Sequence, residues 1–584
     1  MAGRDRAAII GLVAQTLLAR AAPAPVRAGP RVRLEPLPEL AGVAPIDAAE
    51  ALRDLPGLAL LESARPGRRA RWSYLSADPV AVLEEPTPGP DPFAEARRLL
   101  ARLDRNAPAI NGEVPPVERS RPATDGALPA AGELDAPPFL GGLIGFLAYD
   151  LGRALERLPS LALDDQGLPA LRLALHDWVI AWDRTTARAW LAGRALDGDA
   201  DRLARRLREV RARLAGWLAA GRPPTAGDRT ATGELRFVSG LERRGFEAGV
   251  EAVRAAIAEG AIYQANLARR LATPFAGDPW PLYRRLRTGD PALFAAYLDL
   301  GPSPGGLGGP GSDGPAAPAR ATAAPGAGAR RAILSASPEP FLAVDPTGLV
   351  ASDPIKGTRP RGRTPDEDRA LARELLASAK DRAENVMIVD VLRNDLGRVC
   401  RPGSVRVPRL CRLERTAAVQ HLVSTVTGRL DPGRDPFDLL AAAFPGGSIT
   451  GAPKIRAMEL LETLEPVRRG PYTGALGWIG PDGTMATSIL IRTFVADGAR
   501  LTLHVGGGIT WRSDPAAEWQ ETVAKAAGPL GAIGGREVAS VADPAAAPGE
   551  DPAPGEDPAP GGAPAGARDV AGWRASTASP GDGA

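Results

Sequence analysis

The alternation of apolar and polar positions predicts both strands and helices between residues 235 and 540. Short runs rich in β-branched and aromatic residues predict strands at 236–240, 330–336, 341–345, 474–480, 488–496 and 500–509. Longer segments with apolar residues at helical spacing predict helices at 246–264, 366–396, 436–444, 452–466 and 514–527. Because hairpin-like strand pairs occur together with intervening helices, the pattern predicts an α+β fold.

The chain is expected to divide at 221–234, where a Pro/Gly/Thr-rich segment follows a predicted Arg-rich helix. With 584 residues it exceeds what one hydrophobic core organises. We therefore expect an N-terminal extension, two lobes joined by this linker, a low-complexity insertion and a disordered tail of DPAPGED repeats. Their bounds are, in that order, 1–30, 31–220 and 235–540, 301–330, and 541–584.

Composition argues against several classes of protein. A formal net charge of +2 gives no electrostatic reason to expect nucleic-acid binding. Two cysteines and three histidines are too few for a disulfide framework or a Cys/His zinc site. No run of about eighteen apolar residues is present, so no membrane span is expected. Gln15 and Thr16 interrupt an N-terminal stretch that superficially resembles a secretion signal, and we expect a cytoplasmic protein.

Glu384 is a candidate metal ligand. It stands just before the apolar run 386–392, which predicts a buried helical segment. A carboxylate that enters an interior is paired, protonated or bound to a metal. An ion pair with Lys380 one turn earlier explains the same residue equally well.

The last predicted helix carries a polar stripe. Glu518, Glu521 and Lys525 project from one side of it. Two carboxylates and an ammonium suit a metal plus an anion, but a solvated helix face has the same pattern. Sequence spacing favours the solvated face unless residues from elsewhere meet this stripe.

Glycine-rich segments at 445–454 and 504–510 are candidate anion sites, because exposed backbone N–H groups bind carboxylates and phosphates. The first resembles a P-loop but has Ala452 and Pro453 where a nucleotide site needs Lys and Ser/Thr. Arg492, between strand residues, suits a bidentate carboxylate clamp. Lys356, between Ile355 and Gly357, is either an activated nucleophile or a lysine that extends to solvent.

Taken together, these segments closely resemble the chorismate-binding enzymes from about Phe237 to Leu530. The resemblance rests on SPE, PIKGTRPRG, DRAENVMIVDVLRNDLGRV, VQHLVSTVTG, AFPGGSITGAPKIRAMELLETLEP, TSILIRT, GGGI and EWQETVAK, in this order. In the N-terminal lobe, LLES, SYL and PFLGGLIGFLAYDLGRALERLP match more loosely, and the last looks most like the aminodeoxychorismate branch. The family implies a two-lobed fold with antiparallel sheets packed as a sandwich and helices outside.

The resemblance also implies roles for matching residues. Glu384 and Glu521 match two magnesium-binding carboxylates, which favours the metal over the Lys380 pair. Glu339 matches the acid/base that assists departure of the C4 hydroxyl of chorismate. Further residues match positions that hold or surround the carboxylates and ring of chorismate: Gly357, Thr358, Tyr472, Arg492, Gly506, Gly507 and Gly508, with Lys525, Thr450 and His421 in the same pocket.

Two positions distinguish branches of the family. Lys356 stands where anthranilate synthases usually carry Ala; in the aminodeoxychorismate branch this lysine attacks C2 of chorismate while the C4 hydroxyl leaves, and ammonia then adds at C4. Gln264 stands where isochorismate and salicylate synthases have a water-activating lysine, so it argues against water addition. The implied product is 4-amino-4-deoxychorismate, for 4-aminobenzoate and folate, and the alternative product is anthranilate.

The resemblance further implies a partner. Cys400 and Cys411 do not lie in a nucleophile elbow, so ammonia is expected from a separate glutamine amidotransferase subunit. In relatives, the serine of LLES, here Ser63, lines an amino-acid site that binds tryptophan together with an Asn-Pro-x-Pro-aromatic segment. Leu293 replaces the second proline of that segment in this chain.

Overall fold

The structure is a computed structural model that describes residues 31–65, 70–105, 136–222, 233–302, 329–416 and 419–539. The predicted N-terminal extension and tail, most of the predicted linker and nearly all of the 301–330 insertion lie outside the described residues. All the described residues belong to one compact unit.

The larger of two sheets has thirteen strands among the described residues. Neighbouring strands are antiparallel, apart from the parallel pair β23 and β9. In spatial order they are β1 (Val32–Pro36), β8 (Arg188–Arg194), β7 (Trp178–Asp183), β3 (Trp72–Ser76), β2 (Ala59–Glu62), β11 (Phe294–Pro302), β12 (Arg330–Ser337), β21 (Thr493–Asp497), β22 (Arg500–Ile509), β10 (Gln264–Pro274), β9 (Leu235–Ser239) and β23 (Gly535–Glu537), with β18 (Gly451–Ala452) paired to β10.

The smaller sheet has ten described strands, all antiparallel to their neighbours. In spatial order they are β15 (Ile355–Pro360), β17 (Val419–Arg429), β14 (Leu349–Ser352), β13 (Pro340–Val344), β20 (Met485–Ile489), β19 (Ala475–Ile479), β5 (Gly142–Leu147), β6 (Leu171–His176) and β4 (Ala81–Leu83), with β16 (Arg406–Arg415) paired to β17.

Both sheets combine strands from the two predicted lobes. β2 pairs with β11 in the larger sheet, and β5 pairs with β19 in the smaller one. The bounds of the two lobes stay a prediction. Within each sheet, however, backbone hydrogen bonds join a strand that precedes the 221–234 linker to a strand that follows it.

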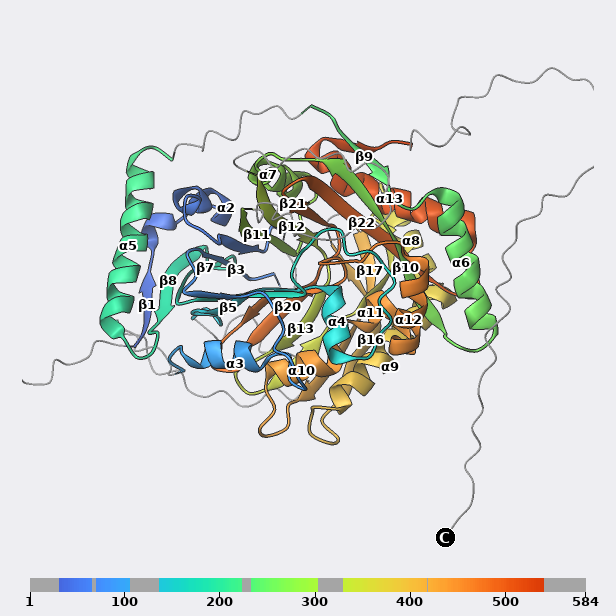
Figure 1. The fold of residues 1–584 in the computed structure, drawn as a ribbon, viewed down its shortest axis with the longest axis horizontal. Helices are drawn as coiled ribbons and strands as arrows, with labels where there is room; N and C mark the ends of the chain where they lie inside the picture. The colour runs from blue at the N-terminus through green and yellow to red at the C-terminus, as the bar shows by residue number, and fades with distance from the viewer. Residues whose placement is uncertain are drawn as a thin grey trace, which may run out of the picture. The chain divides into compact units, whose positions relative to one another are not determined.

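The described helices lie mainly outside the sheets (Figure 1). They are α2 (Pro45–Ala48), α3 (Ala94–Ala101), α4 (Gly152–Leu155), α5 (Ala200–Ala219), α6 (Arg243–Ala258), α7 (Trp280–Gly289), α8 (Pro365–Ala377), α9 (Ala379–Gly397), α10 (Pro436–Ala443), α11 (Gly447–Thr450), α12 (Lys454–Leu464) and α13 (Pro515–Ile533). Short 3-10 helices are η1 (Pro38–Leu40), η2 (Ala49–Leu52) and η3 (Tyr149–Leu151).

The sheets form a sandwich because alternate strand residues face opposite sides. In β12, Ile333 lies in the core between the two sheets with Leu476 and Trp478 of β19, whereas Ala332 and Leu334 lie in the core under the outer helices. A further core packs α3, α9 and α10 on the outer face of the smaller sheet. The predicted α+β sandwich with helices outside is confirmed.

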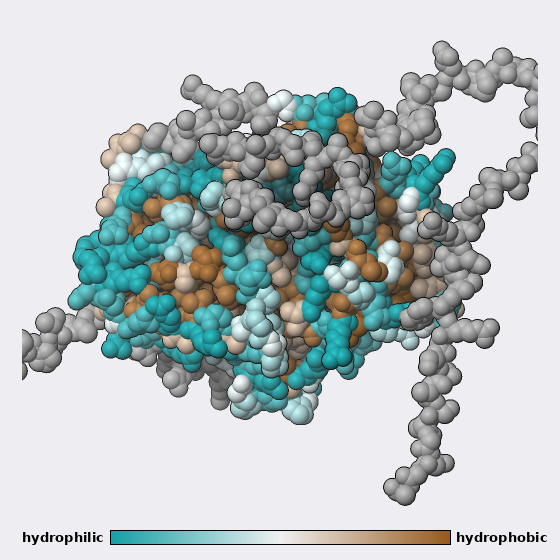
Figure 2. All heavy atoms as spheres, in the orientation of Figure 1, coloured by the Kyte–Doolittle hydropathy of each residue, from teal (hydrophilic) through white to brown (hydrophobic). Residues whose placement is uncertain are grey.

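α5 shows how these helices pack. Leu203, Leu207, Val210 and Leu214 recur at three- and four-residue spacing and are buried, which is typical of an amphipathic helix. Figure 2 shows a largely hydrophilic surface where α5 lies. The Arg-rich helix predicted from the sequence is confirmed.

Several predicted elements are broken where the sequence pattern is continuous. The helix predicted at 366–396 is two helices, because Ser378 is extended and its hydroxyl caps α9 by accepting a hydrogen bond from the N–H of Asp381. The helix predicted at 246–264 ends at Ala258, and Gly260 adopts a φ of 76° before β10 begins. The strand predicted at 488–496 splits into β20 and β21.

The run 386–392 is buried on one side only, which corrects the prediction of a fully buried segment. Ile388, Val389 and Leu392 are buried, whereas Val386 is 39% exposed. α9 therefore packs one face on the sheet and presents the other to the surface. Among the described residues no helix is long and apolar enough to cross a membrane.

Ile333→Ala should lower the free energy of unfolding by about 2–5 kcal/mol, because it empties a fully buried position between the sheets. Leu163→Ala, at a side chain that is 62% exposed, should change it by no more than about 0.5 kcal/mol. Urea unfolding of both variants measures the difference. Equal destabilisation by the two would contradict the intersheet core.

Candidate active site

Lys356 lies on β15, a strand that the sequence pattern did not predict. The pairing of β15 with β17 shifts in register between Lys356 and Thr358. The Lys356 Nζ donates a hydrogen bond of 3.2 Å to the backbone carbonyl of Ser448 in α11. The lysine therefore connects the edge strand of the smaller sheet to the predicted glycine-rich anion segment.

Gly357 allows α8 and α9 to approach this strand. Its φ is 75°, and a Cβ built there would lie 2.8 Å from the Cβ of Asp381 and 2.9 Å from the Cδ1 of Leu375. Any other residue would combine a left-handed backbone with a steric clash. The position next to Lys356 thus requires glycine for two independent reasons.

Glu339 lies beside Lys356 and is 8% exposed. Burial raises the pKa of its carboxyl, and this outweighs the opposing effects of Lys356, a hydrogen bond with the Ser448 side chain and one with the backbone at Ile355. The protonated form is therefore favoured more than in water. This is the state that a proton donor needs.

Glu384 faces Lys356 from α9. Burial raises the pKa of Glu384; Lys356 and Lys380 oppose this rise, whereas Asp381 and Glu521 add to it. Its Oε1 is buried and has no hydrogen-bond partner in the part of the chain that the structure describes. The alternative partner, Lys380, instead forms an ion pair of 3.8 Å with Glu518. A buried carboxylate oxygen without a donor is suited to a cation.

α13 brings the predicted polar stripe to the same place. The Lys525 Nζ lies 2.7 Å from Glu521 and donates to the carbonyl of Gly506 at 2.9 Å. Burial works against ionisation of Glu521, but Lys525, Lys380 and Lys356 together hold its pKa below the ordinary value. Glu518 of the stripe is buried, whereas the side chains of Glu521 and Lys525 are 48% and 45% exposed, so the stripe is part of the site and is also open to solvent.

Gly507 and Gly508 leave room for these side chains. A Cβ on Gly507 would lie 3.2 Å from Glu518 Oε2 and 3.7 Å from Glu521 Oε1. A Cβ on Gly508 would lie 2.3 Å from the Nε2 of Gln264. Because these residues of β22 have no side chains, their backbone lies close to the α13 carboxylates and to Gln264.

Glu518 was missed as a specific site residue, although it stands three residues before Glu521 in the same stripe. It accepts a hydrogen bond of 2.6 Å from Ser513, and burial raises its pKa. Lys380 and Ser448 were missed as well. Among the described residues there is no group of three or more His, Cys, Asp or Glu that could hold a metal. The two predicted ligands, Glu384 and Glu521, lie close enough for burial and the charge of Glu521, among other causes, to raise the pKa of Glu384.

Tyr472 is the one aromatic side chain among the predicted substrate contacts other than His421. Its ring stacks on His504 with centroids 5.1 Å apart and an interplanar angle of 12°. Burial raises the pKa of Tyr472 to about 12, while its hydroxyl is hydrogen-bonded to the side chain of Asn266. Thr450 is fully buried, and its hydroxyl donates to the carbonyl of Gly446 at 3.0 Å.

Arg492 lies in the break between β20 and β21 with a φ of 50°, not within a strand as the sequence suggested. Its Nη1 lies 3.4 Å from Asp290, and its side chain is 47% exposed. One long contact leaves most of the guanidinium donors available. Arg65, which the sequence did not indicate, lies close enough for Arg492 and Asp290 to shift its pKa.

His421 and Thr358 continue this side of the site. The Nδ1 of His421 lies 2.9 Å from the Thr358 hydroxyl across β17 and β15. Burial, together with Arg65 and Arg492, lowers the pKa of His421 to about 4. The imidazole is therefore neutral at neutral pH and can both donate and accept hydrogen bonds.

Ser63, the predicted amino-acid-site residue, has hydrogen-bond partners of its own. Its hydroxyl donates to the carbonyl of Trp72 at 2.9 Å, and its N–H donates to the Ser73 hydroxyl. β2, which ends just before Ser63, pairs with β11 just beyond Leu293. The two segments expected to line an amino-acid site are thus close together.

Comparison with known proteins gives consistent relatives. A family model described as chorismate binding enzyme matches residues 95–531. The chain is 41% identical over 460 residues to aminodeoxychorismate synthase component 1 of Salmonella typhimurium, covering 78% of this chain and 88% of that protein. It is 38% identical over 489 residues to anthranilate synthase component 1 of Streptomyces coelicolor, covering 82% and 84%. A crystal structure of anthranilate synthase component I from Streptococcus pneumoniae aligns with a TM-score of 0.61 and 27% identity, over 80% of this chain and 93% of that one.

Gly357→Ala should reduce both stability and activity, because the added methyl group collides with Asp381 and Leu375 at a positive φ. Gly348→Ala is the matched control: its φ is 77°, but the nearest atom to its Cβ is 3.9 Å away. Both variants have the backbone strain of a positive φ, but only Gly357→Ala adds the collision. Comparing their melting temperatures and turnover therefore measures the effect of the collision. A loss of activity in Gly348→Ala equal to that in Gly357→Ala would contradict this assignment.

Proposed function

This chain belongs to the chorismate-binding enzyme family, and we propose that it aminates chorismate at C4 to give 4-amino-4-deoxychorismate. The observation that supports the proposal best is that Lys356 lies close enough to two carboxyl groups, the buried Glu339 and the partly buried Glu384, for its charge to lower the pKa of both. A nucleophile, a proton donor and a candidate cation ligand therefore share one site. Relatives of this chain include proteins named aminodeoxychorismate synthase and anthranilate synthase. Their names do not distinguish the two reactions for this chain, and Lys356 is the residue that favours C4 amination.

The proposed first step uses Lys356 and Glu339. The unprotonated Nζ attacks C2 of chorismate, the ring double bonds shift, and the C4–O bond breaks. Because hydroxide is a poor leaving group, Glu339 gives it a proton, and it departs as water. The raised pKa of Glu339 keeps that proton available.

The second step reverses the first. Ammonia attacks C4, the double bonds shift back, and the C2–N bond breaks so that Lys356 leaves as a neutral amine. The new C4 ammonium returns a proton to Glu339. Chorismate and ammonia thus become 4-amino-4-deoxychorismate and water, with Lys356 and Glu339 restored.

Several residues are positioned to orient chorismate during these steps. The guanidinium of Arg492 can hold one carboxylate through two parallel hydrogen bonds. Thr358, His421 and the backbone of Gly506–Gly508 offer further donors, and the Tyr472 ring closes one side. Small errors in such positioning are costly, since displacement at C2 needs an aligned approach of the lysine.

Magnesium fits the carboxylates of this site. The Glu384 Oε1 is buried without a donor, and the charge of Glu521 contributes to the shift of the Glu384 pKa. Mg²⁺ is usually bound by one or two carboxylates plus water and substrate. Held by Glu384 and Glu521, it would supply Lewis-acid stabilisation of negative charge on the substrate.

Ammonia is proposed to come from a separate glutamine amidotransferase. The names of the Salmonella typhimurium and Streptomyces coelicolor relatives both include the words component 1. Within the described part of the chain, Cys400 and Cys411 are both buried, which is unsuitable for attack on glutamine. A partner subunit therefore fits better than an internal glutaminase.

Anthranilate synthesis is the second candidate, because the relatives with that name are about as similar to this chain as the aminodeoxychorismate synthases are. Lys356 favours C4 amination, since the resemblance places it where anthranilate synthases usually carry Ala.

Addition of water to chorismate is disfavoured by another residue. Gln264, which is 2% exposed and lies against Gly508, offers no base for activating water.

Lys356→Ala should lower the rate of C4 amination at least about 100-fold, because the covalent route is lost. Arg393→Ala, at an exposed side chain of α9 that pairs with Asp390, is the control and should stay near wild type. Chromatographic identification of the products formed from chorismate, ammonium and magnesium measures both. Full C4 amination by Lys356→Ala would show that the lysine is not the nucleophile.

Glu384→Gln and Glu521→Gln should each raise the magnesium concentration needed for half-maximal activity at least about tenfold, because each loses an anionic ligand at nearly constant shape. Glu374→Gln, at an exposed surface carboxylate, should leave it unchanged. Activity titrations with magnesium, with melting temperatures recorded in parallel, provide the test. An unchanged titration for either site variant would remove that residue from the metal site.

A further inference from the structure

Arg469 is a fully partnered guanidinium in the interior, 2% exposed. Its Nε and Nη2 donate to the two carboxylate oxygens of Glu465 at 2.8 and 2.6 Å. Its Nη1 donates to the carbonyl of Ile449 at 2.9 Å and to the Thr473 hydroxyl at 3.3 Å, and its Nη2 also donates to the carbonyl of Asn266. These bonds use all the donors of an arginine.

Each acceptor other than Glu465 lies next to a residue proposed to surround chorismate. Ile449 precedes Thr450, and Thr473 follows Tyr472. Asn266 of β10 is the register partner of Gly508 in β22. One side chain thus ties together three segments that are far apart in the sequence.

Glu465 extends the same connection along β10. Its Oε1 accepts a hydrogen bond of 3.0 Å from the N–H of Ala268, which is the register partner of Gly506. The ion pair therefore holds β10 at two alternate positions, opposite both ends of the Gly506–Gly508 backbone.

Two rings pack on Arg469. Its guanidinium carbon lies 4.5 Å from the ring centroid of Tyr149 and 5.8 Å from that of Tyr472. The hydroxyl of Tyr472 bonds to the side chain of Asn266, whose carbonyl also accepts from Arg469. The orientation of Tyr472 is consequently fixed from its ring and from its hydroxyl.

Stability alone is a poor reason for such a pair. Desolvating two charges costs roughly what their attraction returns, and replacement of buried ion pairs by apolar residues is often neutral or stabilising. What an apolar pair cannot supply is a set of directed bonds to four separate groups. This geometry suits a side chain that orients the groups to which it is hydrogen-bonded.

We propose that Arg469, held by Glu465, is the positioning residue of the substrate site: it fixes Tyr472, the Thr450 segment and the Gly506–Gly508 backbone relative to one another. The proposal rests on the proposed function, because these groups are the ones assigned to chorismate. Arg469 itself touches neither the reacting atoms nor Lys356. It acts through the groups that it holds.

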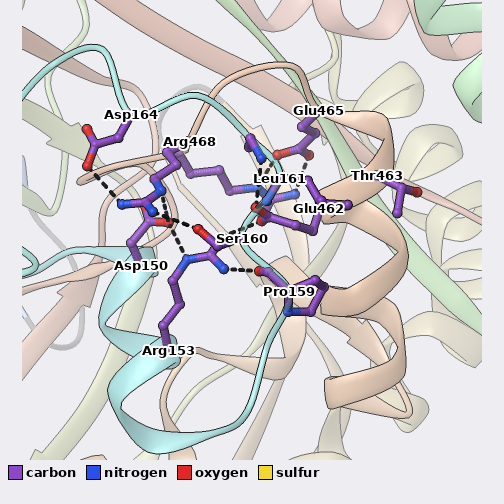
Figure 3. A network of polar contacts seen from close by, with 12 residues as sticks. Asp150, Arg153, Pro159, Ser160, Leu161, Asp164, Glu462, Thr463, Glu465 and Arg468 are labelled. Carbon is purple, nitrogen blue, oxygen red and sulfur yellow. Dashed lines mark hydrogen bonds and ion pairs between the residues drawn. The ribbon is translucent and has the colours of Figure 1, made fainter. Parts of the chain in front are cut away.

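The adjacent Arg468 offers a matched control (Figure 3). It points away from Glu465 to Asp164 at 2.8 Å and to the Ser160 hydroxyl at 2.9 Å, with 28% of its side chain exposed. Its Nε also lies 4.0 Å from Asp150 of η3. These contacts join it to η3 and to the loop after α4, and to none of the groups proposed to bind chorismate. Arg468→Lys therefore changes a neighbouring arginine in the same way.

The test compares Arg469→Lys with Arg468→Lys in the full chain. A lysine keeps the charge but loses the planar fork and two of the five donors. We expect Arg469→Lys to raise KM for chorismate and to lower kcat, each at least about tenfold, with Arg468→Lys within about twofold of wild type. Glu465→Gln keeps the shape of the Glu465 side chain and removes its charge. It should change KM and kcat in the same directions by smaller factors, and it replaces Arg469→Lys in the test if that variant does not fold.

A double-mutant cycle with Tyr472→Phe distinguishes positioning from a purely structural role. If Arg469 acts through Tyr472, the effects on kcat/KM combine to less than their product. Unchanged KM and kcat in folded Arg469→Lys or Glu465→Gln, or effects that multiply independently with Tyr472→Phe, would overturn the proposal. If the wild-type chain itself does not bind chorismate, the proposed function fails and the positioning proposal fails with it. If the wild type binds and aminates chorismate but the variants are unaffected, only the positioning proposal fails.

Discussion

The antiparallel pairing of β10 with β22 is the constraint on which the rest of the site depends. It runs from Ala265 opposite Ile509 to Pro274 opposite Arg500 without interruption. At one end it brings the glycines of β22 beneath α13, where a side chain on the strand would meet Gln264 or the α13 carboxylates. On its other side, β10 receives the Arg469–Glu465 pair. A shift of one residue in this register would displace every one of these contacts.

Charged groups from the smaller sheet, α9 and α13 come close together at this point. Glu339, Glu384, Glu518 and Glu521 are brought together with lysines, and burial acts against ionisation of each carboxyl. The lysines hold the pKa of Glu521 low, while Glu339 and Glu384 stay raised. Neighbouring carboxyls whose pKa values move in opposite directions can take different chemical roles. Lys356 is close enough to Glu339, Glu384 and Glu521 to lower the pKa of each.

Much of the fold was predictable because its periodicity is strong: α5, α12 and α13 and strands such as β12 and β22 lie where the apolar pattern placed them. β10 was not identified, because Ala, Asn and Arg dominate its start and only pairing with β22 makes it a strand. The α+β class followed from the pattern, whereas individual roles at Lys356 or Glu384 required the family resemblance. Arg469 escaped notice because an arginine in a short loop carries no sign of burial.

The most direct test of the account is the product made by the wild-type chain from chorismate, magnesium and ammonium. C4 amination keeps the enolpyruvyl side chain, whereas anthranilate formation releases pyruvate. We therefore predict 4-amino-4-deoxychorismate, identified by mass and by conversion to 4-aminobenzoate with an added lyase, without stoichiometric pyruvate before that lyase is added. Anthranilate with one equivalent of pyruvate from the chain alone would contradict the account.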